Sequence, residues 1–184
     1  MQLRMNTLIN YVAIQKKTIE SVSIEFNSIL CIPGHWASDQ EAKLALVQAT
    51  NGKYIAAGGV MINAKKEKHF TFEVCERDER MKQSFAVAGR VTGVTENFLD
   101  EIDRHRSVVY ISAPIGSLLE AKQIAFAGEA ILKAGGIGIK IETAGKAFEK
   151  DSWFSLTNNF QEHNLFEMFV IDSLYGEDRT VFSD

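Results

Sequence analysis

The segment from residue 118 to residue 134 restricts the possible folds most, because it predicts a helix with a flank of small residues. Ser117 followed by Glu120 forms a capping box, in which the two side chains satisfy free backbone amides at the start of the helix. Gly135 and Gly136 end the helix, since glycine readily takes the left-handed conformation that follows many helices. The flank consists of Leu118, Ala121, Ala125, Gly128 and Leu132, with Ile124 and Ile131 beside it. Small side chains there allow the helix to lie close to a sheet.

The strands of that sheet are predicted by apolar patterns on both sides of the helix. Polar and apolar residues alternate with a period of two in residues 22–32, 69–76 and 137–142. Residues 53–63 and 107–113 are nearly apolar throughout, as in strands that are covered on both faces, and residues 166–171 predict a last strand. Further helices are predicted between Ser38 and Asn51 and over residues 77–88, 96–104 and 146–156.

The order of these elements indicates one α+β domain. Through residue 113 it is strand, helix, strand, strand, helix, strand, which is the split βαβ arrangement of ferredoxin-like folds. We expect a twisted, mainly antiparallel or mixed sheet with helices packed on one face. The domain would span residues 1–184, with an N-terminal extension at residues 1–20 and an acidic tail at residues 172–184.

Composition argues against several classes of protein. Hydrophobic residues make up 46% of the 184 and charged residues 24%, which is typical of a globular domain with a sizeable core. Two cysteines provide no disulfide framework, and no CxxC pair is present to bind zinc. Residues 1–20 lack the apolar core of a signal peptide, and no run approaches the roughly 20 apolar residues of a membrane-spanning helix. We expect a cytoplasmic protein without a cofactor, a metal or a membrane partner.

The net charge of −4 is concentrated in the last quarter of the chain, where residues 141–184 hold three basic and nine acidic residues. Phosphates require lysine and arginine, so this region does not suit nucleic acid, whereas it suits a basic protein partner. The alternative is that these acidic residues bind no partner and only keep the protein soluble. The candidate partner-binding residues are Glu162, Glu167, Asp172, Tyr175, Glu177 and Asp178.

The segment CIPGHW, residues 31–36, raises the possibility of a reactive thiol. Cys31 and His35 follow a predicted strand, and a cysteine beside a histidine can form a thiolate nucleophile. No third residue that would orient the histidine can be identified, and cysteine at the end of an apolar strand often acts as a small hydrophobic residue. We therefore favour a structural role, in which Pro33-Gly34 ends the strand and Trp36 packs over the following helix start.

Phosphate-loop and metal patterns are weak. Gly135-Gly136 follows a helix and precedes a strand, which is the reverse of a phosphate loop, and Thr143-Ala144-Gly145-Lys146 lacks the required glycine spacing. His69 and Glu73 share one face of a predicted strand and could provide two metal ligands. An ordinary solvated strand face gives the same pattern, so we expect no metal.

One polar face extends over three predicted strands. Its members are Glu25, Asn27, Thr71, Glu73, Lys140 and Glu142. If the three strands share a sheet and no helix covers this side, these residues form a shallow platform. Two carboxylates with separated pKa values could perform acid–base chemistry there, and a platform could equally bind a protein or be an ordinary solvated face.

Two elements of the chain resemble a known family. CIPGHW after a strand, and later LEAKQIAFAGEAILKAGGIGIKIETAG at residues 119–145, are similar to a family of uncharacterised bacterial domains with CIPGxW and aGGxGxKxExAG elements. The resemblance covers roughly residues 29–155, and Trp153 matches a tryptophan of the family. It implies a bacterial source and, for some members, a role as immunity proteins encoded beside secreted toxins. It implies no catalytic residues.

These observations favour a binding protein over an enzyme. The first hypothesis is an immunity-type protein that blocks a basic toxin through its acidic residues, with Trp36, Trp153 and Tyr175 as possible aromatic anchors. The second is an enzyme acting on a small molecule through Cys31, His35, Glu73 or Glu142. The third is an assembly module that pairs through a sheet edge.

Overall fold

The computed structural model describes residues 27–158, 160–170, 174–175 and 181–182. Its strands are β1 (Asn27–Gly34), β2 (Tyr54–Ala57), β3 (Val60–Asn63), β4 (Lys68–Glu76), β5 (Ser107–Pro114), β6 (Gly138–Ile141), β7 (Lys146–Glu149), β8 (Leu174–Tyr175) and β9 (Val181–Phe182). Its helices are α2 (Asp39–Ala49), α3 (Met81–Ala88), α4 (Glu96–Asp103), α5 (Leu118–Lys133), α6 (Lys150–Asn158) and α7 (Glu162–Phe169). Residues 1–20 lie outside the described residues, and within 172–184 only the short pair β8 and β9 is described.

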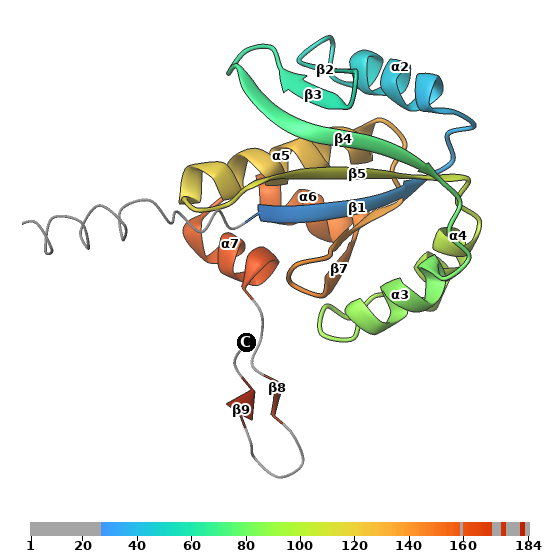
Figure 1. Cartoon of the computed structure of the whole chain (residues 1–184). Helices are drawn as coiled ribbons and strands as arrows, with labels where there is room; N and C mark the ends of the chain where they lie inside the picture. The colour runs from blue at the N-terminus through green and yellow to red at the C-terminus, as the bar shows by residue number, and fades with distance from the viewer. Residues whose placement is uncertain (1–26, 159, 171–173, 176–180, 183–184) are drawn as a thin grey trace, which may run out of the picture.

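The expected α+β class is confirmed. Seven strands form one antiparallel sheet in the order β2-β3-β4-β5-β1-β6-β7 (Figure 1). The order along the chain begins as a ferredoxin-like fold does, but the pairing differs, because β1 lies between β5 and β6 and is antiparallel to both. In the ferredoxin-like arrangement the first strand lies between the third and the fourth, which would place β1 between β4 and β5. Here β5 pairs with β4 directly and separates it from β1, so the ferredoxin-like order of strands is wrong.

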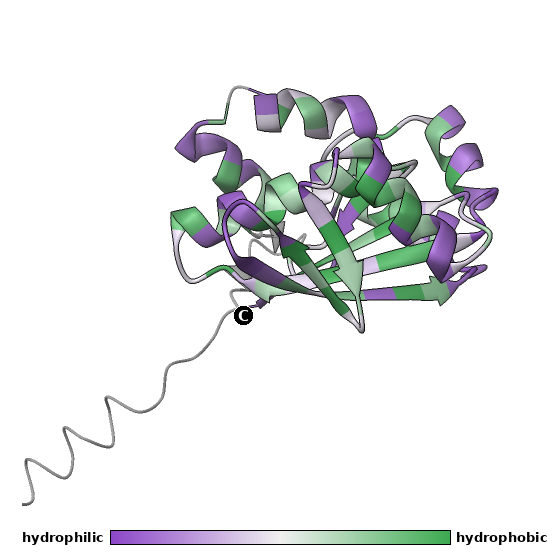
Figure 2. Ribbon diagram, turned by 90° about the horizontal axis from the view of Figure 1, so that it is seen from above, coloured by the Kyte–Doolittle hydropathy of each residue, from purple (hydrophilic) through white to green (hydrophobic). Residues whose placement is uncertain are grey.

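The two faces of the sheet are covered unequally. Helices α2, α5, α6 and α7 pack on one face, where the main core includes Leu30, Ile111, Ile139 and Trp153. The helices thus lie mainly on one face, as expected, while α3 and α4 pack on the other face around a smaller core that includes Phe85 and Ile102. This smaller core reaches Cys31, Val108 and Ala147 and leaves the region of β2, β3 and β4 uncovered on that side. Figure 2 shows hydrophobic, green segments both along the strands and in the helices that lie over them.

Residues 53–63 form a hairpin rather than one strand. Gly58 and Gly59 have φ values of 56° and 81°, and they join β2 to β3 as a two-residue turn. Both glycines thus reverse the chain, where a single strand covered on both faces was predicted. The exposed fractions of Ile55 and Ile62, 46% and 38%, also exclude cover on both faces.

Two predictions near the carboxyl end are wrong. Residues 146–149 form β7, which pairs with β6 in a hairpin, and the helix begins only at Lys150. Residues 166–171 belong mostly to helix α7 and not to a strand. Leu165 and Met168 are buried three positions apart, which is a helical spacing, and a short apolar run alone cannot distinguish the two structures.

Within the described part of the chain, no helix combines the length and apolar character needed to cross a membrane.

Candidate functional site

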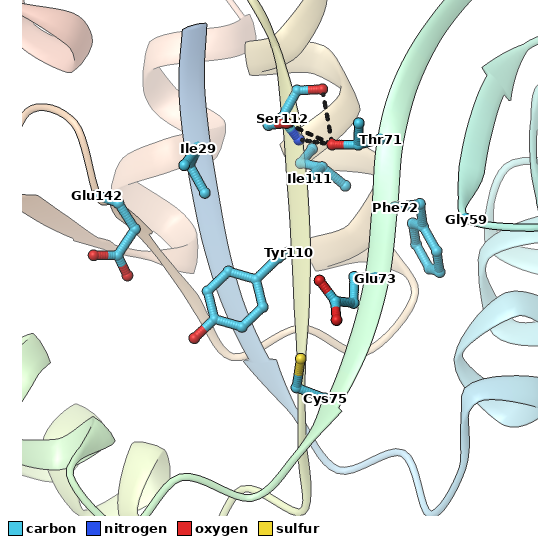
Figure 3. Close-up of a pocket in the computed structure, with 10 residues that line it drawn as sticks. All are labelled: Ile29, Gly59, Thr71, Phe72, Glu73, Cys75, Tyr110, Ile111, Ser112 and Glu142. Atoms are coloured by element: carbon cyan, nitrogen blue, oxygen red, sulfur yellow. Dashed lines mark hydrogen bonds between the residues drawn. The ribbon is translucent and has the colours of Figure 1, made fainter.

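A groove of about 600 Å³ lies on the open face of the sheet, beside the part that α3 and α4 cover (Figure 3). The pairing of β1, β4 and β5 places its residues in rows. Ile29 lies opposite Ser112 and Ser112 opposite Thr71, while Tyr110 lies opposite Glu73. Because side chains of a strand alternate between faces, these residues all point to the side away from α5.

Two carboxylates flank the groove with a phenol between them. Figure 3 shows Tyr110 with Glu73 on one side and Glu142 on the other. Lys140 Nζ lies 2.8 Å from Glu142 Oε2 and donates a hydrogen bond of 2.5 Å to Ser84 Oγ on α3. Among the residues that the structure describes, no cation forms an ion pair with Glu73. The groove therefore keeps one unneutralised carboxylate.

Burial raises the pKa of the Tyr110 phenol, and the nearby Cys31 thiol and Glu142 carboxylate add to the effect. Tyr110 thus stays protonated at neutral pH and serves as a hydrogen-bond donor and an aromatic surface. Thr71 and Ser112 add hydroxyl groups, with the Thr71 Oγ1 accepting a bond of 3.1 Å from the Ser112 amide. The polar groups of the groove can therefore donate and accept hydrogen bonds to a ligand.

Exposed apolar side chains surround the groove. Ile29 lines it, and Val60 and Ile62 lie on the same open face of the neighbouring strand β3. Each of the three has an exposed fraction of 38%. A cluster of exposed aliphatic residues beside polar groups is typical of a surface that binds another molecule.

Cys31 and His35 do not form a catalytic pair. Cys31 is fully buried beneath α3, where its Sγ lies 3.7 Å from Met81 Sδ, and burial raises the pKa of its thiol to about 12. His35 is half-exposed at the far end of the strand, with Nε2 3.9 Å from Glu101 Oε1. Cys75, which does line the groove, also has a raised pKa, mainly through burial and then through Glu73.

The segment CIPGHW instead forms a structural junction with the end of α5. Trp36 is buried, and its Nε1 donates a hydrogen bond of 2.8 Å to the carbonyl of Ala134. The amide of Ile137 donates to the carbonyl of Pro33 at 2.9 Å, and Gly34 forms a bridge with Gly136. A Cβ atom on Gly34 would lie 2.1 Å from the Trp36 ring, so the ring packs directly over the glycine. The two elements that carry the family resemblance therefore meet in space.

The structure describes only some of the residues that the sequence predicted to bind a partner. Glu162 and Glu167 are exposed on α7, where Phe166 between them has an exposed fraction of 61%. Tyr175 lies in β8, while Asp172, Glu177 and Asp178 lie outside the described residues, as does Glu25. Trp153 is fully buried and donates to the carbonyl of Ala125 at 3.1 Å, so it is a packing residue and not a surface anchor.

Sequence reasoning missed Tyr110 because residues 107–113 were expected to be covered on both faces. It missed Ile29 because only polar side chains were assigned to the face of residues 22–32 that carries Glu25 and Asn27. It did assign Thr71, Glu73, Lys140 and Glu142 to one face, and the structure places all four on the open side of the sheet. His69 also faces this side, but no group of three metal-binding side chains exists among the described residues.

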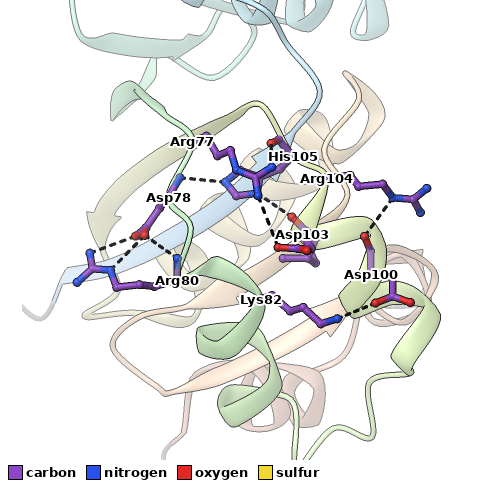
Figure 4. A network of polar contacts seen from close by, with 9 residues as sticks. Arg77, Asp78, Arg80, Lys82, Asp100, Asp103, Arg104 and His105 are labelled. Carbon is purple, nitrogen blue, oxygen red and sulfur yellow. Dashed lines mark hydrogen bonds and ion pairs between the residues drawn. The ribbon is translucent and has the colours of Figure 1, made fainter.

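Sequence reasoning also missed a polar network that anchors α3 and α4 (Figure 4). His105 is buried, its Nδ1 donates to the carbonyl of Ile102 at 2.7 Å, and its Nε2 accepts a bond of 3.2 Å from the amide of Asp78. Lys82 Nζ lies 2.6 Å from Asp100 Oδ1 and joins the two helices. Burial lowers the pKa of His105, so its neutral form is favoured in the folded protein.

Comparison with known proteins adds no relative: no protein-family model, no curated protein and no solved structure matches this chain.

Proposed function

We propose that this protein is a non-catalytic binding protein of the immunity type, which blocks a basic protein partner on the open face of its sheet. The observation that carries the proposal is the groove in which Glu73 lies beside Tyr110 and exposed aliphatic residues, with no ion-pair partner for Glu73 among the described residues. A lysine or arginine of the partner would meet the carboxylate of Glu73 and the face of the Tyr110 ring. Ile29, Val60 and Ile62 would supply apolar contact around this anchor.

Charge supports a basic partner over an acidic one. The charged residues that line the groove are Glu73 and Glu142, and both are acidic. The whole chain carries a net charge of −4, so the long-range field also attracts a cationic surface. Glu162 and Glu167 on α7 would extend the acidic surface, in keeping with the partner residues expected from the sequence.

The thiols argue against the enzyme hypothesis. A nucleophilic cysteine requires a lowered pKa, whereas burial raises that of Cys31 to about 12 and raises that of Cys75 as well.

The proposal is tested by photo-cross-linking in source cells. Benzoylphenylalanine at Val60 should capture one basic protein, whereas the same residue at Leu44, which is exposed on α2 over the opposite face of the sheet, should not. The captured protein is then produced with this chain and on its own. We expect the captured protein to arrest growth when it is produced on its own. Co-production with this chain should restore growth, whereas co-production with its Glu73→Lys variant should not.

The control is Glu76→Lys, which reverses an exposed carboxylate on the same strand outside the groove. It should leave the rescue intact. A captured protein that is harmless alone, or a rescue that Glu73→Lys and Glu76→Lys affect equally, would refute the proposal.

A further inference from the structure

A second groove lies on the opposite side of the molecule, between α5 and the β2–β3 hairpin. It consists of two adjoining hollows of about 210 Å³ each, which share Lys53, Tyr54 and Phe126. Tyr54 points to the face of the sheet that α5 covers, so this groove is separate from the open face where Glu73 lies. The charged residues that line this second groove are mainly lysines, whereas those that line the groove on the open face are glutamates, and the proposed function makes no use of the second groove.

Four lysines converge on this groove. They are Lys53, Lys66, Lys122 and Lys133. Within the described residues, the first three form no ion pair with a carboxylate, whereas Lys133 pairs with Glu129. Three positive charges without a paired acid around so small a space attract a multiply charged anion.

Two of these lysines, Lys53 and Lys122, lie over aromatic rings. Lys122 Nζ lies 4.9 Å from the centre of the Phe160 ring and 5.9 Å from that of Phe126, and Lys53 Nζ lies 5.4 Å from that of Tyr54. Such contacts favour a limited set of side-chain positions and lower the entropy cost of gathering the ammonium groups around a ligand. Asn63, which is buried, also lines the groove.

A buried acid indicates that the ligand also carries a hydrogen-bond donor. Glu129 has an exposed fraction of 8%, and its Oε1 pairs with Lys133 Nζ. The other oxygen, Oε2, has no hydrogen-bond partner among the described residues. A buried carboxylate oxygen without a donor costs free energy, and a ligand hydroxyl could supply the donor after a small turn of the Glu129 side chain.

We infer that this groove binds a small phosphate-bearing molecule that also carries hydroxyl groups. Lysine ammonium groups bind phosphate as point charges, and the combined hollows have the size of a phosphorylated sugar. The narrow space and the negative net charge of the chain disfavour a nucleic acid. The phosphate lies among Lys53, Lys66 and Lys122, and a hydroxyl reaches Glu129.

Calorimetric titration with inorganic phosphate and with ribose 5-phosphate tests the inference on the full chain. Both should bind, and ribose 5-phosphate should bind more tightly. Lys66→Gln and Lys122→Gln should each raise the Kd for both probes about fivefold or more. Glu129→Gln should reduce the advantage of ribose 5-phosphate, because the neutral amide accepts a weaker hydrogen bond than a carboxylate.

The matched control is Lys65→Gln, which removes the same charge from the same turn although Lys65 does not line the groove. It should change the Kd less than twofold or so if binding is local. An equal loss in Lys65→Gln and Lys66→Gln would mean only general attraction to a basic surface and would overturn the inference. The inference would also be overturned if either probe failed to bind, or if the two probes had equal Kd values.

Discussion

At the scale of single residues, the position of a side chain in the sheet decides its chemistry. Cys31 and Cys75 both point to the open side, but α3 covers the first and leaves the second at the edge of the groove. Burial in apolar surroundings disfavours the thiolate, which explains why the pKa of Cys31 rises to about 12. A cysteine beside a histidine in the sequence therefore says little about reactivity until the cover over the strand is known.

The two thiols should differ in their reaction with Ellman's reagent. At about pH 8 the folded protein should release at most one equivalent, from Cys75, and reaction of Cys31 should require unfolding in guanidinium. Cys75→Ser should therefore show almost no reaction when folded and one equivalent when unfolded. Rapid reaction of folded Cys75→Ser would show that Cys31 is accessible as a thiolate and would revive the enzyme hypothesis.

His105 should make folding stability depend on pH. Burial lowers its pKa in the folded state below the ordinary value of about 6.5, so the unfolded chain binds more protons in the interval between the two values. Its contribution is complete above about pH 6.5 and is lost as the pH falls through the folded pKa.

His105→Gln should lower the free energy of unfolding by about 1–3 kcal/mol at neutral pH, because the Asp78 amide and the Ile102 carbonyl lose their partner. Urea unfolding should show this loss becoming smaller toward about pH 5. The control His163→Gln, at an exposed position on α7, should leave the pH dependence unchanged. A constant difference between His105→Gln and the unchanged protein over this range would exclude the linkage.

At the scale of elements, the close approach of helix α4 to strand β6 explains why a glycine occupies position 138. A Cβ atom on Gly138 in β6 would lie 2.5 Å from the Phe98 ring and 2.9 Å from the backbone oxygen of Phe148. The backbone oxygen belongs to the paired strand β7 and cannot move without disrupting the hairpin. Helix α4 can therefore pack over this end of the sheet only because position 138 lacks a side chain.

Gly138→Ala should lower the free energy of unfolding by about 2 kcal/mol, which is typical of overpacking in a well-filled core. Gly116→Ala provides the control, because its Cβ would have only an ordinary contact of 3.7 Å with Glu120. Urea unfolding followed by tryptophan fluorescence compares the two variants. Similar stability of both variants would contradict the packing argument.

Elements with local signals could be predicted from the sequence. Helix α5 begins at the predicted Ser117 cap, whose Oγ accepts from the Glu120 amide, and it ends before Gly135. The period of two in residues 69–76 and 137–142 placed Glu73, Lys140 and Glu142 on one face. The order of the strands in the sheet carries no such local signal, so the position of β1 between β5 and β6 could not be predicted. Helix α7 was missed because its apolar run is too short to reveal its period.

At the scale of the whole molecule, the two faces of the sheet carry surfaces of opposite character. The open face has the acidic groove around Glu73, and the side of α5 has the groove of four lysines. The sheet and its core separate them, so a substitution at one surface should leave the direct contacts at the other unchanged and act there only through the long-range field. The net charge of −4 then favours attraction of a cationic partner from a distance, whichever surface it finally contacts.

This separation predicts how ionic strength acts on the proposed partner complex. Raising NaCl from about 0.05 M to about 0.5 M shortens the screening length from more than 10 Å to about 4 Å, so the association rate with the cross-linked basic partner should fall about tenfold or more. Glu73→Gln should reduce this salt dependence and also speed dissociation, because the partner's cation loses its carboxylate. Lys66→Gln removes a positive charge from the opposite side, so it should leave the dissociation rate unchanged and raise the association rate slightly. Stopped-flow or surface plasmon resonance measurements separate the two rates. An association rate that does not respond to salt, or a dissociation rate that changes as much with Lys66→Gln as with Glu73→Gln, would show that the acidic groove is not the surface that holds the partner.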